Sequence, residues 1–512
     1  MNAPSGAWQA KSPNLARNSG WNLAAFGCVL AANFVTVPFV VRWAGVEAFG
    51  RAGIVLAVCA PLILIGTVLG QALTREVAQV ASPSSGEAAR LVDAALRLGL
   101  AACAAGWVLL VALGPSVVSW LTRDATAANA LTLAFAIAAT GWAAQQIGLL
   151  LQGARAARQD FRTIAQVAAL SAAATIVGTL AATWMWRTAE GYLAGVAFGF
   201  VAGMLGWIAV SRDGHSGLGF WRGERRAETA ALLHFGKWQG TAQLAGTIGN
   251  QIDRYALASL APLAVVGHYN VANRLQEAAY IGVVKSAEVL FPRFGSMSSS
   301  HVEQRQSFFQ VSSWVVGVFS AMVLAPLVPL ADATLRLWVG PQAAEGAGLM
   351  LRTLVLGGVV GAGSNVFLYY AMGMGRTSVV AILSSVYSVL TVVTTVLLLR
   401  LFGPQAAGAG LLLASVVRIA LGLHLTRRDF FPGLRWRELF ASTALPIVCG
   451  CAVAVLLDAA DVFKPAGWIA LGIDYALVAA AVLLATVVVT ALGGGRPILA
   501  QAWRSLRAAA GR

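Results

Sequence analysis

The sequence has few charged residues, and acidic residues are the scarcer kind. Only 11% of its residues are charged, against about 25% in soluble proteins, and 36 Lys and Arg outnumber 21 Asp and Glu. Apolar residues make up 58% of the 512 residues, which is more than a protein in water can bury. These proportions exclude a soluble globular protein. They predict an all-α polytopic membrane protein whose solvent is lipid.

The sequence also lacks the motifs by which many catalytic and metal sites are recognised. It contains no GxxxxGK[ST] phosphate loop, no HExxH and no CxxC. The five cysteines lie inside apolar segments, where a free thiol behaves as a small hydrophobe, and the five histidines have no ligand-like spacing. We therefore expect no cofactor, no metal, no ATP hydrolysis and no enzymatic activity.

The net charge of +15 would suggest nucleic acid binding in a soluble protein. No basic patch with interleaved aromatic residues accompanies it, so nucleic acid is not expected as a partner. In a membrane protein topology explains this charge better, because cytoplasmic loops collect Lys and Arg. Placing both termini in the cytoplasm puts most of the basic loop residues on the cytoplasmic side.

Apolar runs predict about fourteen membrane-spanning helices. Their expected ranges are 20–41, 49–72, 92–113, 129–151, 163–186, 191–211, 236–259, 263–290, 309–331, 347–372, 377–401, 405–426, 438–457 and 467–492. A Gly-rich basic stretch near the middle of the chain divides the first twelve spans into two halves of six helices. The expected parts are an N-terminal bundle at 1–211, a cytoplasmic linker at 212–235, a C-terminal bundle at 236–426, and two additional helices with a basic tail at 427–512.

The two halves of the chain share a faint internal similarity. At an offset of 217 residues, Gly50 matches Gly267 and Asn33 matches Asn250. Six helices in each half would make the two bundles parallel repeats.

Polar side chains form a stripe along the seventh and the eighth predicted spans. Spacings of three and four residues place each stripe on one face of a helix. The seventh span carries Gln239, Gln243, Thr247, Asn250 and Arg254, with Asp253 beside them, and the eighth carries Asn270, Arg274, Glu277, Lys285 and Glu288. A charge at the centre of a membrane helix costs about 2.5–3.5 kcal/mol, so the stripes must pair with each other or face water.

Two interpretations of the stripes are open. In the first, all six charges cancel as static pairs that hold the helices together, since Arg274 and Glu277 are three residues apart, as are Lys285 and Glu288, and Asp253 adjoins Arg254. In the second, the stripes line a wet cavity for a hydrophilic or anionic cargo. The candidate cargo ligands are then Arg254, Arg274, Asn250, Asn270 and Lys285, and the candidates for pairing or ion coupling are Asp253, Glu277 and Glu288.

Polar residues of other spans extend the candidate site. Arg418 lies in the middle of the twelfth span, and Asn33 lies within the first. Arg42 ends the first span, where it either joins the site or extends its charged end to the interface. Arg352 lies early in the tenth span with no partner near it in sequence. This cationic surplus favours an anionic ligand such as phosphate.

The run "IDRYALASLAPLAVVGHYNVANRL" at 252–275 resembles a signature of the polysaccharide transporter family, the Wzx-type oligosaccharide-lipid flippases of the multidrug/oligosaccharidyl-lipid/polysaccharide exporter superfamily. The matching positions are Asp253, Arg254, Val266, Gly267, Tyr269 and Ala272. The stretches "RWAGVEAFGRAGI", "LTREVAQ" and "LRLWVGPQAAEGAGLMLRTLVLG" are also similar to that family. The chain departs from the pattern at Phe49, where the family commonly has Tyr.

The resemblance implies two six-helix bundles around a central cavity. It also implies a flippase that moves a polyprenyl-pyrophosphate-linked oligosaccharide across the bacterial inner membrane by alternating access. The pathway would be lipopolysaccharide, O-antigen or exopolysaccharide biosynthesis, and the cationic residues Arg254 and Arg274 would contact the cargo. Implied partners are the lipid-linked glycan and membrane lipids, with a polysaccharide polymerase and chain-length machinery as further candidates. Two alternatives stay open: a drug/cation antiporter of the same superfamily, and a membrane glycosyltransferase or polysaccharide polymerase.

Overall fold

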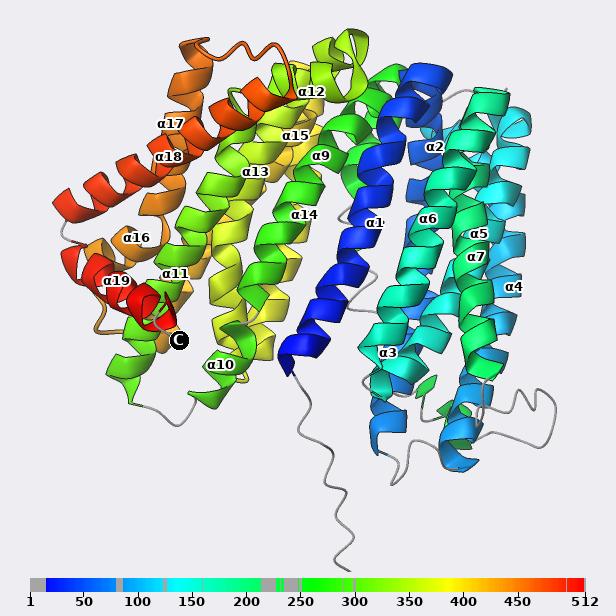
Figure 1. Ribbon diagram of the computed structural model, residues 1–512, viewed down its shortest axis with the longest axis horizontal. Coiled ribbons are helices and arrows are strands. Elements are labelled where there is room, and N and C mark those ends of the chain that lie inside the picture. Colours follow the sequence, from blue (N-terminus) through cyan, green and yellow to red (C-terminus); the bar gives the residue numbers. More distant parts are fainter. Residues whose placement is uncertain are drawn as a thin grey trace, which may run out of the picture. The chain divides into compact units, whose positions relative to one another are not determined.

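The computed structural model of the protein describes residues 15–79, 86–122, 127–158, 160–212, 227–230, 232–233, 247, 251–288, 290–297, 301–493 and 495–510. Within these ranges the chain forms helices and no β-strand (Figure 1). The expected all-α membrane protein is confirmed. Eleven described helices are long and apolar enough to cross a membrane, or twelve if a pair bent by 51° forms one span.

The helices of the first half follow one another with short connections. They are α1 (Leu15–Ala44), α2 (Val46–Cys59), the 3₁₀ turn η1 (Ala60–Ile63), α3 (Leu64–Gln79), α4 (Gly86–Thr122), α5 (Ala127–Ala157), α6 (Phe161–Trp186) and α7 (Ala189–Arg212). In sequence order they correspond to the first six predicted spans, with α2, η1 and α3 forming the second. The turn η1 has Pro61 in its first positions, so this span has the irregularity that an internal proline imposes.

The second half is divided into more elements. Its helices are α9 (Leu263–Glu288), α10 (Leu290–Ser296), α11 (Val302–Leu324), η2 (Ala325–Leu327), α12 (Ala331–Val339), α13 (Pro341–Gly373), α14 (Thr377–Phe402), η3 (Pro404–Ala406), α15 (Ala407–Leu425), the π turn η4 (Thr426–Phe430), α16 (Trp436–Thr443), α17 (Leu445–Ala459), α18 (Trp468–Leu492) and α19 (Arg496–Ala510). Residues 251–260 are also helical.

The seventh and eighth predicted spans, which are polar, are not among the eleven described helices that are apolar enough to cross a membrane. The helix α9 covers the eighth predicted span, but it carries too many polar residues to qualify by composition. Most of the seventh predicted span lies outside the described residues, as does most of the linker predicted at 212–235. The short helices α10, α12 and α19 were not predicted.

The contacts of the chain divide it into two units. The first comprises residues 1–36, 58–119 and 125–243, and the second comprises 37–57, 120–124 and 244–512. In the first unit α7 packs along α5 and α6 (Figure 1). In the second unit α13 is the central helix, because it contacts α9, α11, α12, α14 and α15.

Helix ends in the second unit are set by glycine and proline. Gly340 has φ +100° and directly precedes Pro341, the first residue of α13. Gly403 has φ +81° after the last residue of α14 and directly precedes Pro404. A positive φ favours glycine, and a proline is tolerated in a first turn, so each pair ends one element and starts the next.

The helices α2 and α9 approach closely within the second unit. A Cβ atom on Gly267 would lie 2.7 Å from Cγ1 of Val46, and one on Gly50 would lie 2.7 Å from the backbone nitrogen of Gly267. Residues without side chains allow two helix backbones to pack at this distance. The equivalent positions of the faint sequence repeat, Gly50 and Gly267, thus contact one another.

We predict that Gly267→Ala lowers the thermal unfolding midpoint of the detergent-solubilised protein, because the new methyl group overlaps the backbone of α2. Overpacking of this kind costs about 1–3 kcal/mol. Gly282→Ala is the matched control, since Gly282 lies on the same helix and a Cβ added there would meet no atom within 4 Å. Equal midpoints for the two variants would contradict the close packing of α2 and α9.

Candidate functional site

A polar cavity lies inside the second unit. Its volume is about 400 Å³, and its walls come from the helical segment 251–260 and from α9, α13, α14 and α15. The polar residues that matter most for its chemistry are Asp253, Arg254, Glu277, Tyr387 and Arg418. Tyr387 and Arg418 lie more than 100 residues after the other three, so the cavity forms only when the helices pack.

Asp253 is held by hydrogen bonds to two other helices. Its side chain is 8% exposed. One carboxylate oxygen accepts a hydrogen bond of 2.6 Å from the Tyr269 hydroxyl on α9, and the other accepts one of 3.1 Å from the Thr395 hydroxyl on α14. Bonds to both oxygens offset part of the cost of burying the charge.

Arg254 forms hydrogen bonds with other residues than its neighbour Asp253 does. Its Nε donates to the Asn270 side-chain oxygen at 2.8 Å, and a terminal nitrogen donates to the Gln251 side chain. Asn270 is itself buried, and a Cβ on Gly53 of α2 would collide with its amide. Asn270 therefore positions the Arg254 guanidinium at the cavity wall, and Asn270 itself is not among the lining residues.

Arg418 is the second cation of the cavity. Its side chain is 8% exposed, one terminal nitrogen donates to the Gly361 carbonyl at 2.7 Å, and its guanidinium lies 4.4 Å from the centre of the Tyr387 ring. Its Nε is buried and has no hydrogen-bond partner among the described residues. A buried guanidinium donor without an acceptor is costly, so this atom would be stabilised by an acceptor that a change in packing brings within reach.

The glycines of α13 beside the cavity support close helix packing. A Cβ on Gly357 would lie 3.0 Å from the Leu412 nitrogen of α15, and one on Gly361 would lie 3.6 Å from the Arg418 guanidinium. The absence of a side chain at Gly357 lets α15 approach, whereas a Cβ at Gly361 would make only ordinary van der Waals contact with Arg418. This packing role is the one that small residues have between membrane helices.

The charges farther along α9 pair locally. Arg274 and Glu277 form an ion pair of 3.8 Å, and Lys285 and Glu288 form one of 2.8 Å. Of these four residues only Glu277 lines the cavity. The i,i+3 pairs of the first interpretation are therefore present, whereas Asp253 and Arg254 are bound by other partners. The binding of a cargo in the second interpretation stays a prediction.

The remaining candidates lie elsewhere. Arg42 is exposed in the last turn of α1. Asn33 donates a hydrogen bond of 3.0 Å to the Val29 carbonyl of its own helix. Neither lines the cavity, and Asn250 lies outside the described residues.

Sequence inspection missed several residues of this site. Tyr387 and Thr395 lie on an apolar helix and carry no charge, so no local signal marks them. Thr395 is 142 residues from the Asp253 carboxylate that it contacts. The polar periodicity of the seventh and eighth spans marks only the half of the cavity wall that those spans supply.

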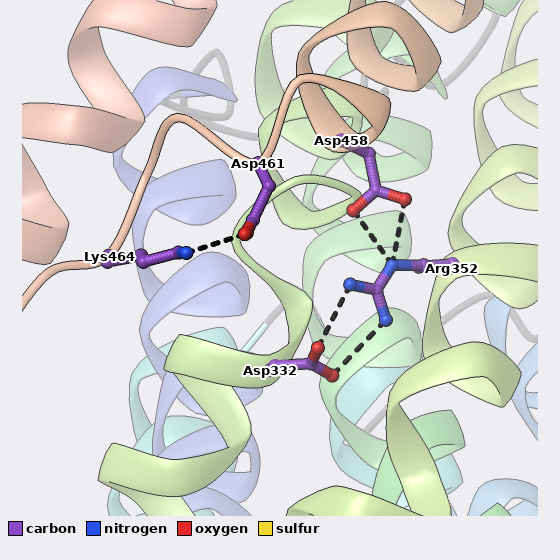
Figure 2. A network of polar contacts seen from close by, with 5 residues as sticks. All are labelled: Asp332, Arg352, Asp458, Asp461 and Lys464. Atoms are coloured by element: carbon purple, nitrogen blue, oxygen red, sulfur yellow. Dashed lines mark hydrogen bonds and ion pairs between the residues drawn. The ribbon is translucent and has the colours of Figure 1, made fainter.

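Arg352 forms a separate ionic cluster near one end of the second unit (Figure 2). Its guanidinium bonds Asp458 of α17 at 2.9 and 3.0 Å, and Asp332 of α12 at 3.0 and 3.2 Å. Nearby, Lys464 pairs with Asp461 at 2.6 Å. Arg352, for which the sequence offered no nearby partner, thus ties α12, α13 and α17 together.

The family of the chain follows from a comparison of its sequence. A family profile described as "Polysaccharide biosynthesis protein" matches residues 15–298, more than half of the chain. The chain belongs to the polysaccharide biosynthesis protein family. This confirms the family resemblance carried by residues 252–275. No curated protein matches the sequence.

Solved structures show the fold that the family member adopts. The chain is similar to the lipid II flippase MurJ in an inward closed conformation, with a TM-score of 0.72 and 11% identity over 92% of this chain and 98% of that one. It is also similar to an inward-facing multidrug resistance MATE family transporter of the MOP superfamily, with a TM-score of 0.69 and 15% identity over 78% of this chain and 96% of that one. A third similar structure is a MOP superfamily transporter from Pyrococcus furiosus, with a TM-score of 0.56 and 15% identity over 81% of this chain and 95% of that one. This family member therefore has the fold of flippases and exporters.

We predict that Arg352→Gln destabilises the protein by about 1–3 kcal/mol, because it leaves two partly buried carboxylates without their shared cation. A lower thermal unfolding midpoint in detergent is the measurement. Arg336→Gln, which removes an exposed cation from the neighbouring helix α12, is the control and leaves the midpoint unchanged. If Arg352→Gln and the control gave the same midpoint, the cluster would contribute nothing to stability.

Proposed function

We propose that the protein is a flippase for a polyprenyl-pyrophosphate-linked oligosaccharide, acting in the bacterial inner membrane by alternating access and without ATP. The family and the fold support a role in moving a lipid-linked substrate for polysaccharide biosynthesis. The observation that carries the proposal further is that two arginines, Arg254 and Arg418, line one cavity, and that the buried Nε of Arg418 has no hydrogen-bond partner among the described residues.

The charge balance of the cavity favours an anionic cargo once hydrogen bonding is considered. The wall contains two arginines, Arg254 and Arg418, and two acids, Asp253 and Glu277. Both oxygens of Asp253 already accept hydrogen bonds, and Glu277 has Arg274 as an ion-pair partner. Asp253 is thus bonded within the protein and Glu277 is partly neutralised by Arg274, whereas the Nε of Arg418 has no hydrogen-bond partner in the part of the chain that the structure describes.

A pyrophosphate suits this arrangement. Its oxygens accept several charge-assisted hydrogen bonds, and planar guanidinium groups donate them in pairs. The hydroxyl of Tyr280, which accepts a bond of 3.3 Å from Asn365, and the ring of Tyr387 give the cavity partners for sugar hydroxyls and sugar faces. A pyrophosphate-sugar headgroup that binds these residues can cross the membrane inside the protein and does not have to enter the lipid hydrocarbon.

The drug/cation antiporter remains the second candidate, on the strength of one observation. Asp253 is a buried carboxylate at a cavity wall, which is the type of residue that a cation requires. The Pyrococcus furiosus transporter is described as having a binding pocket of reversed polarity that suggests a different function. The flippase requires a pocket that binds an anion, and the antiporter requires one that binds a cation. Substitution of the charged residues of the pocket can therefore distinguish the two functions.

We predict that Arg418→Gln reduces flipping of a radiolabelled lipid-linked oligosaccharide in proteoliposomes by about 10- to 100-fold, the factor that a lost charge-assisted hydrogen bond of 1.5–3 kcal/mol represents. Arg254→Gln has an effect of the same size. Arg400→Gln is the control, because it removes an exposed cation at the end of α14, outside the cavity wall.

The same series distinguishes the candidates. Full flipping by both Arg254→Gln and Arg418→Gln would overturn the cavity as the cargo site. Cation-driven drug efflux by the purified protein that is lost in Asp253→Asn, together with no flipping by the wild type, would favour the antiporter.

A further inference from the structure

The C-terminal helix α19 is amphipathic and basic. Ile498 and Ala502 pack against α11, and Gln501 bonds Ser307 of the same helix. Its outer side exposes Arg496, Trp503 and Arg504, with Trp503 at 57% exposure. The described part of the helix contains no acidic residue. A helix with this division of residues is typical of one that lies in the membrane interface.

The short helix α16 has a similar character. Leu439 and Ser442 are buried, whereas Trp436 and Phe440 are exposed on one side of the helix. The Arg427 guanidinium lies 4.9 Å from the centre of the Trp436 ring, and Arg435 and Arg437 are exposed. Aromatic rings beside arginines are typical of the region where lipid headgroups meet the hydrocarbon.

The two helices lie at the same end of the second unit. The Arg437 side chain of α16 donates a hydrogen bond of 3.1 Å to the Gly493 carbonyl, in the connection between α18 and α19. Both helices also contact α11, and Figure 1 shows them beside it. We call the exposed residues Arg435, Trp436, Arg437, Arg496, Trp503 and Arg504 the basic rim.

Arginine dominates the charge of this end. Among the described residues, the carboxylates near the rim are Asp429, which pairs with Arg428 at 3.5 Å, and two exposed ones, Glu438 and Glu303 in the first turn of α11. They do not balance the four arginines of the rim. An exposed cluster of cations at the level of a membrane interface attracts anionic headgroups, by about 1 kcal/mol for each Lys or Arg.

We propose that the basic rim binds anionic phospholipid headgroups of the membrane leaflet that it faces, with Trp503 and Trp436 anchoring the two helices at the interface. This site is separate from the cavity, and it requires no assumption about the cargo. The ligand class follows from the pairing of exposed arginines with exposed tryptophans, because zwitterionic lipids would satisfy the rings but not the surplus charge.

The test is native mass spectrometry of the full-length purified protein, titrated with phosphatidylglycerol and, separately, with phosphatidylcholine. The wild type should prefer phosphatidylglycerol. Arg435→Gln/Arg504→Gln should weaken its binding by about fivefold for each arginine removed, the factor equivalent to about 1 kcal/mol. Binding of phosphatidylcholine should stay unchanged.

The matched control is Arg336→Gln/Arg400→Gln, which removes the same charge. Three apolar helices, α13, α14 and α15, separate Arg336 from the rim residues, and α15 separates Arg400 from them, so both control residues lie at the opposite membrane face. Equal losses in the two double variants, or no preference of the wild type for phosphatidylglycerol, would overturn the proposal.

If the rim variant fails to fold, the salt dependence of phosphatidylglycerol binding by the wild type still tests the proposal. Its preference for phosphatidylglycerol should fall steeply as salt is raised, because exposed charges are screened. A preference that does not change with salt would contradict an electrostatic site.

Discussion

The polar interior of the second unit depends on how two adjacent charges, Asp253 and Arg254, are satisfied. Neighbours in sequence would be expected to neutralise each other, but each is bonded to other helices. Asp253 accepts from α9 and α14, and Arg254 donates to Asn270 of α9. Since lipid satisfies neither charge, the helices that supply these partners must pack around the segment 251–260. The cavity is the space that this packing leaves.

The arginines of this unit fall into two kinds, which differ in how fully they are bonded. Arg352 is 22% exposed, and its guanidinium contacts both oxygens of two carboxylates. Such a residue fastens helices and has little capacity left for a ligand. Arg418 is more deeply buried, yet it contacts one carbonyl and one aromatic ring, and its Nε has no hydrogen-bond partner among the residues that the structure describes. Burial alone would not separate the two, but the inventory of hydrogen bonds does.

The sequence predicted what depends on local composition and missed what depends on distant pairing. The apolar spans were predictable, because about 20 apolar residues are needed to cross the hydrocarbon wherever they occur. The pair Arg274 and Glu277 was predictable from i,i+3 spacing. The partners of Arg352 lie 20 and 106 residues away, so no window along the chain connects them. Helices such as α12 and α19 were missed because they are too short or too polar to resemble a span.

Half of the candidate site was therefore open to prediction, and the reason bears on its function. Polar residues on the seventh and eighth spans were visible because charge is rare in a chain with 11% charged residues. The opposite wall, formed by α13, α14 and α15, offers Gly361, Tyr387 and one buried cation, Arg418. A wall of this kind contributes little charge of its own and holds its cation against an aromatic ring and a backbone carbonyl. The acids of the cavity lie on the first wall, where Asp253 accepts hydrogen bonds through both oxygens and Glu277 pairs with Arg274, and this arrangement supports the proposal of an anionic cargo.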